Sequence, residues 1–176
     1  MKKNNVVLIG FMGSGKTTIG LRLSYCMRRV VEDTDKLIEK KTGRSISDIF
    51  AADGENSFRN METEMLKELK ETCRNKIISV GGGTPLREEN RKLLKDLGHV
   101  IYLRVTPETV MKRLQGDTTR PLLQVEDPQE KIRKMMADRK FAYETCADFV
   151  IDTDDLQINR IVDMIESYLA EKERME

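Results

Sequence analysis

A glycine-rich stretch near the N-terminus has the residue types and the spacing that bind a nucleoside triphosphate. Residues 10–17 read GFMGSGKT and match the pattern G-x-x-x-x-G-K-[ST]. In this pattern glycines let backbone N–H groups surround phosphate oxygens, Lys16 neutralises the β and γ phosphates, and the Thr17 hydroxyl coordinates Mg²⁺. An apolar run precedes the stretch and a helical pattern follows it, so we reject a chance glycine-rich turn. The predicted nucleotide-binding residues are Gly13, Ser14, Gly15, Lys16, Thr17 and Thr18.

Two carboxylates lie two residues apart where a second apolar run ends, in residues 30–35 with the sequence VVEDTD. Residues two apart on a strand point to the same face, so we expect Asp33 and Asp35 to project together toward the nucleotide. Phosphoryl transfer to a hydroxyl needs one group that orients or deprotonates the acceptor and another that helps to hold Mg²⁺. The alternative is a solvated turn or a helix N-cap, which is a common role for Asp before a helix. The phosphate loop favours the catalytic interpretation.

Five short, apolar and β-branched runs predict the strands that position these residues. They are Val6 to Ile9, Val30 to Val31, Ile77 to Val80, Val100 to Leu103 and Phe149 to Ile151. Helical patterns cover about residues 18–27, 60–73 and 158–169. This alternation predicts an α/β fold with a parallel sheet covered on both faces. Ligands of such folds bind beyond the carboxyl ends of the strands, where the phosphate loop and the two aspartates are expected.

Length and composition predict a single globular domain over residues 1–176. Lys plus Arg number 31 against 30 Asp plus Glu, and a net charge of +1 provides no overall field to attract nucleic acid or an anionic membrane. Cys26, Cys73 and Cys146 are odd in number and widely spaced, as expected of reduced thiols in a cytoplasmic protein. The only histidine, His99, adjoins the fourth predicted strand, and we interpret it as a strand-end residue rather than a base.

These motifs together resemble those of the shikimate kinase family. In family order and spacing, the matching segments are residues 10–17 with GFMGSGKT, 33–35 with DTD, 58–62 with FRNME, 81–83 with GGG, 120–123 with RPLL, and Arg139 with Tyr143. They extend from near residue 6 to about residue 153, so the resemblance covers nearly the whole chain. It implies ATP-dependent phosphorylation of the 3-hydroxyl of shikimate, with Mg²⁺ as cofactor, in the cytoplasmic route to chorismate and the aromatic amino acids.

The resemblance also implies an architecture. This is a P-loop kinase with three α/β/α layers and a five-stranded parallel sheet in the order 2-3-1-4-5. A substrate-binding region of about residues 33–62 and a mobile lid of about residues 112–128 belong to the same domain. The resemblance favours a monomer whose partners are ATP and shikimate.

Residue by residue, the resemblance assigns the acceptor site. It places Asp35 against the acceptor hydroxyl, Asp33 near Mg²⁺, and Arg59 and Arg139 around the substrate carboxylate. A guanidinium pairs bidentately with a carboxylate, which suits an acidic substrate. The alternative for Arg59 is an i, i+3 ion pair with Glu62, and both can hold if Glu62 positions Arg59. The alternative for Arg139 is a solvated basic face.

A glycine run follows the third predicted strand and is implied to contact the substrate. At Gly81, Gly82 and Gly83, missing side chains let a ligand approach the backbone, although a flexible turn is the alternative. Val80 stands where the family often has a hydroxyl residue, which puts metal affinity in doubt rather than reaction type. A second departure, residues 25–29 with YCMRR, is expected to affect packing more than catalysis.

The lid contributes the remaining residues. The resemblance implies that the lid closes over ATP and brings Arg120 to the transferring phosphate, where arginine stabilises the developing charge. Lys16, Asp35 and Arg120 are then the predicted catalytic residues. Arg113 is assigned to the adenine, with residues 152–155 as the opposite wall.

Three other classes of protein share part of this sequence pattern. A regulatory GTPase would need an Asn-Lys-x-Asp motif, but Asn75-Lys76-Ile77 is followed by Ile78. Gluconate and nucleoside monophosphate kinases share the phosphate loop and an arginine-bearing lid, and physical reasoning alone leaves gluconate open as a substrate. A binding module without activity is disfavoured, because the residue types needed for the chemistry are all present at Lys16, Thr17, Asp35 and Arg120.

Overall fold

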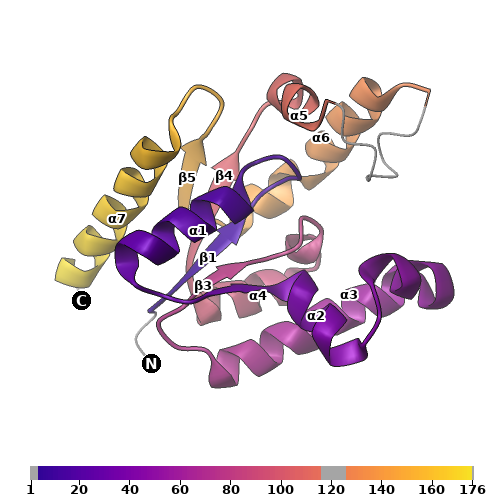
Figure 1. Ribbon diagram of the computed structural model, residues 1–176, viewed down its shortest axis with the longest axis horizontal. Helices are drawn as coiled ribbons and strands as arrows, with labels where there is room; N and C mark the ends of the chain where they lie inside the picture. The colour runs from indigo at the N-terminus through magenta and orange to yellow at the C-terminus, as the bar shows by residue number, and fades with distance from the viewer. Residues whose placement is uncertain (1–3, 116–125, 176) are drawn as a thin grey trace.

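The computed structural model describes residues 4–115 and 126–175. Its strands form one parallel sheet in the order β2-β3-β1-β4-β5, which confirms the order implied by the family resemblance. The strands are β1 Asn5–Ile9, β2 Val31–Asp33, β3 Ile77–Ser79, β4 Gly98–Arg104 and β5 Phe149–Asp152. Because β1 is the central strand, the phosphate loop that follows it lies at the middle of the sheet's carboxyl edge (Figure 1).

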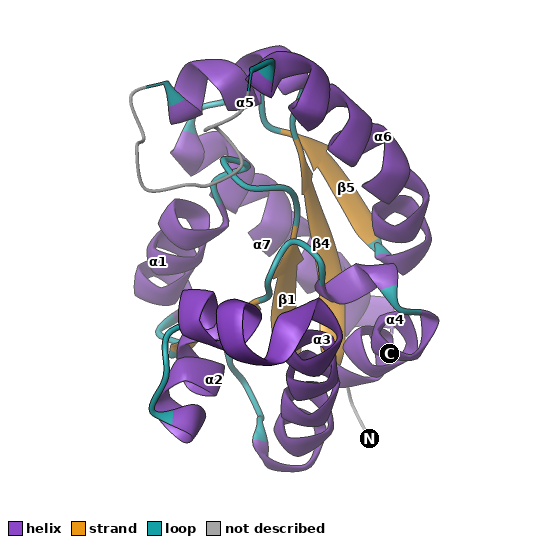
Figure 2. Cartoon of the chain, turned by 90° about the vertical axis from the view of Figure 1, so that its right-hand side faces the viewer, coloured by secondary structure: helices purple, strands orange, loops and turns teal. Residues whose placement is uncertain are grey.

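Helices cover both faces of this sheet and complete three layers (Figures 1 and 2). In chain order they are α1 Lys16–Met27, α2 Thr34–Thr42, α3 Ile46–Thr72, the 3-10 turn η1 Thr84–Leu86, α4 Glu88–Leu97, α5 Pro107–Leu114, α6 Pro128–Cys146 and α7 Ile158–Met175. Helices α1 and α7 share a buried cluster on one face, whereas α3, α4 and α6 share a cluster on the other. This is the α/β architecture that the alternating patterns predict.

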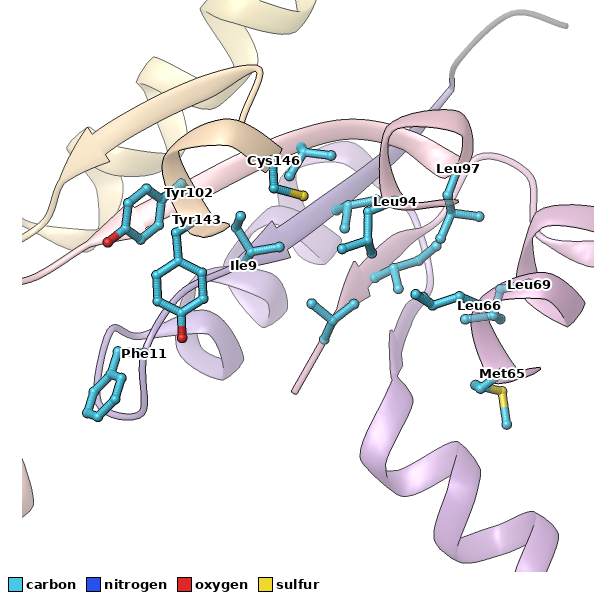
Figure 3. Packing of buried hydrophobic residues seen from close by; sticks show 14 of the residues in the cluster. Ile9, Phe11, Met65, Leu66, Leu69, Leu94, Leu97, Tyr102, Tyr143 and Cys146 are labelled. Atoms are coloured by element: carbon cyan, nitrogen blue, oxygen red, sulfur yellow. The ribbon is translucent and has the colours of Figure 1, made fainter. Parts of the chain in front are cut away.

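Alternate residues of β1 belong to these two clusters. Val6 and Leu8 pack with α1 and α7, while Val7 and Ile9 pack with α3, α4 and α6. All four side chains are 0% exposed, so the strand is buried on both sides, which explains its unbroken apolar sequence. Figure 3 shows Ile9 in the second cluster, with residues of α3 and α4 on one side and of α6 on the other.

Two predicted boundaries are wrong, and both concern the acceptor side of the molecule. The helix expected over residues 60–73 begins at Ile46 and contains a non-helical residue, Gly54, with φ 80° and ψ 171°. The second strand ends at Asp33, so Asp35 lies in the first turn of α2 rather than on a strand. The strand argument for a common direction of the two aspartates therefore fails. None of the helices in the described ranges is long and apolar enough to cross a lipid bilayer.

Candidate active site

A cavity of about 490 Å³ lies beyond the carboxyl ends of β1, β2 and β3 and collects most of the predicted site. The predicted residues that line it are Gly13, Gly15, Lys16, Thr17, Thr18, Asp33, Asp35, Arg59, Gly81, Gly82, Gly83 and Arg139. Ser14 is 1% exposed and does not line the cavity. Arg113 lies outside the lining, and Arg120 falls outside the described residues. Segments separated by more than a hundred residues thus converge on one volume.

The phosphate loop has the backbone geometry that its glycines permit. Gly13 and Gly15 have φ values of 74° and 96°, which side-chain-bearing residues rarely adopt. Helix α1 begins at Lys16, immediately after the loop, so its N-terminal N–H groups favour negative charge at the cavity. The Lys16 ammonium donates to the carbonyl oxygens of Gly10 at 2.8 Å and Phe11 at 3.1 Å. The loop therefore holds its lysine against its own backbone, beside the cavity.

Asp33 is the helix N-cap that the sequence offered as an alternative, and it also lines the cavity. It is the N-cap of α2, because its Oδ1 accepts hydrogen bonds from the N–H groups of Asp35 at 3.0 Å and Lys36 at 3.2 Å. Both bonds use the same oxygen, and Asp33 also lines the cavity. The capping interaction fixes the start of α2 and hence the position of Asp35.

Asp35 is the most perturbed acid of the cavity. Its Oδ1 is buried and has no hydrogen-bond partner among the described residues. Burial, together with the negative charges of Asp33 and Glu62, raises the pKa of Asp35 to about 6 against the opposing effect of Lys16 and Arg59. A carboxyl group tuned toward neutral pH at the floor of a cavity is suited to exchange a proton with a bound hydroxyl.

Arg59 is held in place by carboxylates of its own helix. Its Nη1 donates to Glu62 Oε2 at 2.7 Å and its Nη2 donates to Glu55 Oε1 at 3.1 Å. The predicted i, i+3 pair with Glu62 is thus present, and the same guanidinium lines the cavity. A Cβ at Gly83 would lie 2.3 Å from the Arg59 nitrogens, so the missing side chain makes room for the arginine. Sequence reasoning had assigned this room to the substrate.

Arg139, on α6, reaches the cavity from the opposite side. Its guanidinium lies 5.5 Å from the centre of the Phe11 ring, in a cation–π contact. A Cβ at Gly82 would lie 3.3 Å from Arg139 Nη1, which brings the arginine beside the glycine run. One helical turn further on, the Tyr143 hydroxyl donates to the Gly82 carbonyl at 2.7 Å. Figure 3 shows Tyr143 beside Tyr102, and the centres of the two rings are 5.1 Å apart.

Part of the cavity wall is apolar, and sequence reasoning missed it. Ile46 and Phe50, from the first part of α3, line the cavity together with Phe58. The rings of Phe50 and Phe58 are 4.9 Å apart across the break at Gly54. The i, i+3, i+4 spacing of Ile46, Ile49 and Phe50 was the available signal for this helix. This wall offers a ligand an apolar surface in the same cavity as the charged groups.

Arg113, in the last turn of α5, connects two loops rather than lining the cavity. It donates to the carbonyl of Gly13 at 2.9 Å and to that of Thr153 at 3.0 Å. Asp152 pairs with Arg104 in this structure, and so belongs to a surface ion pair. The phosphate loop and the loop after β5 are therefore linked by one guanidinium, which is where the sequence expected an adenine site.

Comparison with known proteins gives one consistent family. The family profile described as shikimate kinase matches residues 12–170. A shikimate kinase of Thermodesulfovibrio yellowstonii is 43% identical over 171 residues, which cover 97% of this chain and 96% of the relative. That of Thioalkalivibrio sulfidiphilus is 41% identical over 165 residues, covering 94% of this chain and 86% of the relative.

Solved structures agree with the sequence comparison. A structure of shikimate kinase from Acinetobacter baumannii in complex with shikimate superposes with a TM-score of 0.89 at 36% identity, covering 97% of this chain and 95% of that one. The shikimate kinase of Bacteroides thetaiotaomicron gives a TM-score of 0.88 at 29% identity, covering 96% and 99%. With a sequence match over nearly its whole length and the same fold, this chain belongs to the shikimate kinase family.

Proposed function

We propose that this protein transfers the γ-phosphoryl group of ATP to the 3-hydroxyl of shikimate, giving shikimate 3-phosphate and ADP. Asp35 is the observation that carries the proposal. A buried carboxyl with one unpartnered oxygen lies between a phosphate loop and two arginines, in a cavity that also has an apolar wall. That combination suits a small, cyclic, hydroxylated acid. Family membership, at about 40% identity to curated shikimate kinases, supports the same assignment.

The charged residues in and around the cavity have different roles in this reaction. Lys16 and the loop N–H groups hold the β and γ phosphates, while Arg59 and Arg139 pair with the substrate carboxylate and fix its orientation. Asp35 then orients the acceptor hydroxyl and accepts its proton as the new O–P bond forms. We propose that Arg120, which lies outside the described residues, neutralises charge on the transferring phosphoryl group. Arg113 is proposed as an ATP-binding residue through its contact with the phosphate loop.

The residues present fit a magnesium ion held jointly with the nucleotide. The described residues contain no cluster of three or more His, Cys, Asp or Glu side chains that could hold a metal alone. Mg²⁺ usually keeps several waters and binds one or two protein oxygens plus substrate phosphates. Thr17 and Asp33 both line the cavity, and the capping bonds of Asp33 use only Oδ1. These two residues would hold the ion, which supplies charge neutralisation on the phosphates when bound.

A substrate panel tests the activity. ADP release with Mg²⁺-ATP is measured for shikimate, quinate, gluconate and nucleoside monophosphates, with the intact chain and with Asp35→Asn. We expect turnover with shikimate and a loss of about 10²–10⁴-fold in kcat in Asp35→Asn, because the proton acceptor is removed while ATP still binds. Turnover with gluconate but not shikimate would reject the proposed substrate and keep the kinase mechanism.

Two further variants complete the panel. Asp96→Asn is the matched control, since Asp96 is an exposed carboxylate paired with Lys70 on the surface of α4, and we expect unchanged turnover. Arg120→Ala is expected to lower kcat by about 10³-fold or more if this arginine contacts the phosphoryl group. Unchanged turnover in Arg120→Ala would assign Arg120 to the surface.

We further propose that the protein acts as a cytoplasmic monomer in the route to chorismate and the aromatic amino acids. The reaction of the family supports this placement. Light scattering after gel filtration should give the monomer mass of 20.3 kDa, and twice that mass would refute the monomer.

A further inference from the structure

A group of buried polar residues lies directly behind Arg59. Glu62, Thr63, Thr84 and Asn90 are 1%, 4%, 1% and 0% exposed. They come from three elements, α3, η1 and α4, that pack against one another beside the cavity. Buried polar groups of this kind are stable only when their hydrogen bonds are satisfied. The arrangement of those bonds shows which residue controls Arg59.

Glu62 is the centre of this group. Its Oε2 accepts the hydrogen bond from Arg59 Nη1 at 2.7 Å, and its Oε1 accepts one from the Thr84 hydroxyl at 2.5 Å. Each carboxylate oxygen therefore has a different donor, one from the substrate-binding arginine and one from η1. Together the two donors set the plane of the carboxylate and so the direction in which Arg59 points.

Thr84 is itself held on both sides. Its N–H donates to the Gly81 carbonyl at 3.0 Å, and its own carbonyl accepts from Asn90 Nδ2 at 2.9 Å. The Thr63 hydroxyl lies 2.8 Å from Asn90 Oδ1, which returns the chain of contacts to α3 one residue after Glu62. A closed path of hydrogen bonds thus anchors the Thr84 hydroxyl against α3.

The same oxygen of Glu62 faces a second acid. A Cβ built at Gly81 would lie 2.9 Å from Glu62 Oε1, 2.9 Å from Asp35 Oδ1 and 3.3 Å from Thr84 Oγ1. Three oxygens, two of them on carboxylates, therefore surround one point. Without a donor on Glu62 Oε1, repulsion from Asp35 would favour rotation of the Glu62 carboxylate away from the site. The hydroxyl of Thr84 is the donor that opposes this rotation.

Resting on the proposed function, we infer that Thr84 is a positioning residue for substrate recognition: its hydroxyl locks the Glu62 carboxylate, which in turn presents Arg59 to the carboxylate of the acid substrate. Thr84 touches neither substrate nor nucleotide in this scheme. Its effect is therefore confined to the binding of the acid, and ATP binding is independent of it.

Steady-state kinetics of Thr84→Val test the inference, because valine keeps the shape of threonine and lacks the hydroxyl. We expect the KM for shikimate to rise about tenfold, equivalent to about 1.4 kcal/mol, with the KM for ATP unchanged. Thr84→Ser, which restores the hydroxyl, should return the KM to within about twofold of the parent value. Equal changes in both KM values, or no rescue by serine, would overturn the inference.

Thr72→Val is the control with the same chemical change. Thr72 is the last residue of α3, ten positions beyond Glu62, and does not line the cavity. Its hydroxyl donates to the Glu68 carbonyl at 2.8 Å, so this variant loses a hydroxyl that has no bond to Glu62 and should leave the KM for shikimate unchanged. An equal rise in the KM for shikimate in Thr72→Val would show that the effect of Thr84→Val does not depend on the bond to Glu62.

A double-mutant cycle tests whether the effect passes through Glu62. In a Glu62→Gln background, Thr84→Val should add less than about twofold to the KM for shikimate, because the carboxylate that Thr84 orients is already gone. A full additional tenfold rise would mean that Thr84 acts by another route, and would reject the inference.

A crystal structure of Thr84→Val separates failure of this inference from failure of the proposed function. If the parent protein does not phosphorylate shikimate, the proposed function fails, yet the position of Arg59 can still be compared between the two proteins. Displacement of the Glu62 carboxylate and the Arg59 guanidinium supports the positioning role. Unchanged positions of both groups overturn it, whatever the substrate.

Discussion

At the scale of single residues, the two aspartates at the end of β2 have different environments, although they are only two positions apart in the sequence. Asp33 is bonded to two N–H groups of the helix that it caps, whereas Asp35 has a buried oxygen without a partner. The capping bonds hold the first carboxylate in place, and burial opposes the charge of the second. The difference supports the division of labour proposed for them, with Asp33 at the metal and Asp35 at the acceptor hydroxyl.

The buried acid makes folding depend on pH. The pKa of Asp35 is about 6 in the folded chain, against an ordinary value of 3.8. Between these values the folded chain retains a proton that the unfolded chain has released. The contribution of protonated Asp35 to the free energy of unfolding is therefore fully present below about pH 4 and is lost as the pH rises through about 6. The shift corresponds to a cost on the order of 3 kcal/mol at neutral pH.

Asp35→Asn should consequently stabilise the ligand-free protein above pH 6, by roughly 1–3 kcal/mol, because no charge then has to be buried. The gain should shrink toward zero near pH 4. Urea unfolding followed by circular dichroism between pH 4 and 8 measures it, with Asp96→Asn as a surface control that should not stabilise. A variant less stable than the parent at pH 8 would contradict this account of Asp35.

At the scale of elements, the loop after β3 leaves room for the Arg59 guanidinium. Gly83 has φ −90° and ψ −11°, values that any residue can adopt, so its backbone does not require glycine. Glycine is required because of Arg59 on α3. A Cβ at residue 83 would lie 2.3 Å from the nitrogens of the Arg59 guanidinium. A side chain at this position would push the arginine out of place and leave the loop conformation intact.

Gly83→Ala is therefore expected to raise the KM for shikimate about 10–100-fold, with less than about 1 kcal/mol lost in stability, since Arg59 is flexible and can move aside. Gly20→Ala is the control with the same chemical change. Gly20 lies inside α1, where a Cβ would make an ordinary contact of 3.5 Å with Leu8, and helical alanine is favoured by up to about 1 kcal/mol. An unchanged KM for shikimate in Gly83→Ala would show that the position of Arg59 does not depend on the missing side chain at residue 83.

At the scale of the whole molecule, one sheet carries both cores. The cluster under α1 and α7 and the cluster under α3, α4 and α6 meet through strands whose alternate residues point into each. Neither core can lose its strands without exposing the other. We therefore propose that the chain is a single domain, with the phosphate loop and the substrate-binding region on one cooperative unit.

Mutations in the two cores test this unity. Leu66→Ala and Ile165→Ala each truncate a fully buried side chain, one in each cluster, and should each lower the free energy of unfolding by about 2–5 kcal/mol. In both variants, urea transitions followed by circular dichroism and by tyrosine fluorescence should coincide at a lower midpoint. Separate transitions, with one core unfolding before the other, would divide the chain into two domains.

The sequence by itself determined the features that depend on neighbouring residues. The phosphate loop follows from a contiguous glycine pattern, the buried strands follow from short apolar runs, and most of the family motifs are short contiguous segments. Local pattern failed at Asp35, because the capping bonds to the Asp33 side chain begin α2 at Thr34 and so end the strand before Asp35. It also missed the first part of α3, where the break at Gly54 interrupts the helical period.

Only the tertiary structure decided how the site works. Three features depend on contacts between segments 20 or more residues apart. They are the effect of Glu62 and Arg59 on the pKa of Asp35, the packing of Arg59 against Gly83, and the hydrogen bond from Thr84 to Glu62. Burial and hydrogen bonding depend on distances that exist only after the chain has folded, and no local pattern encodes them. Residue type and spacing therefore predicted most of the polar groups that line the cavity, while packing of α3 and η1 against the sheet set their orientation.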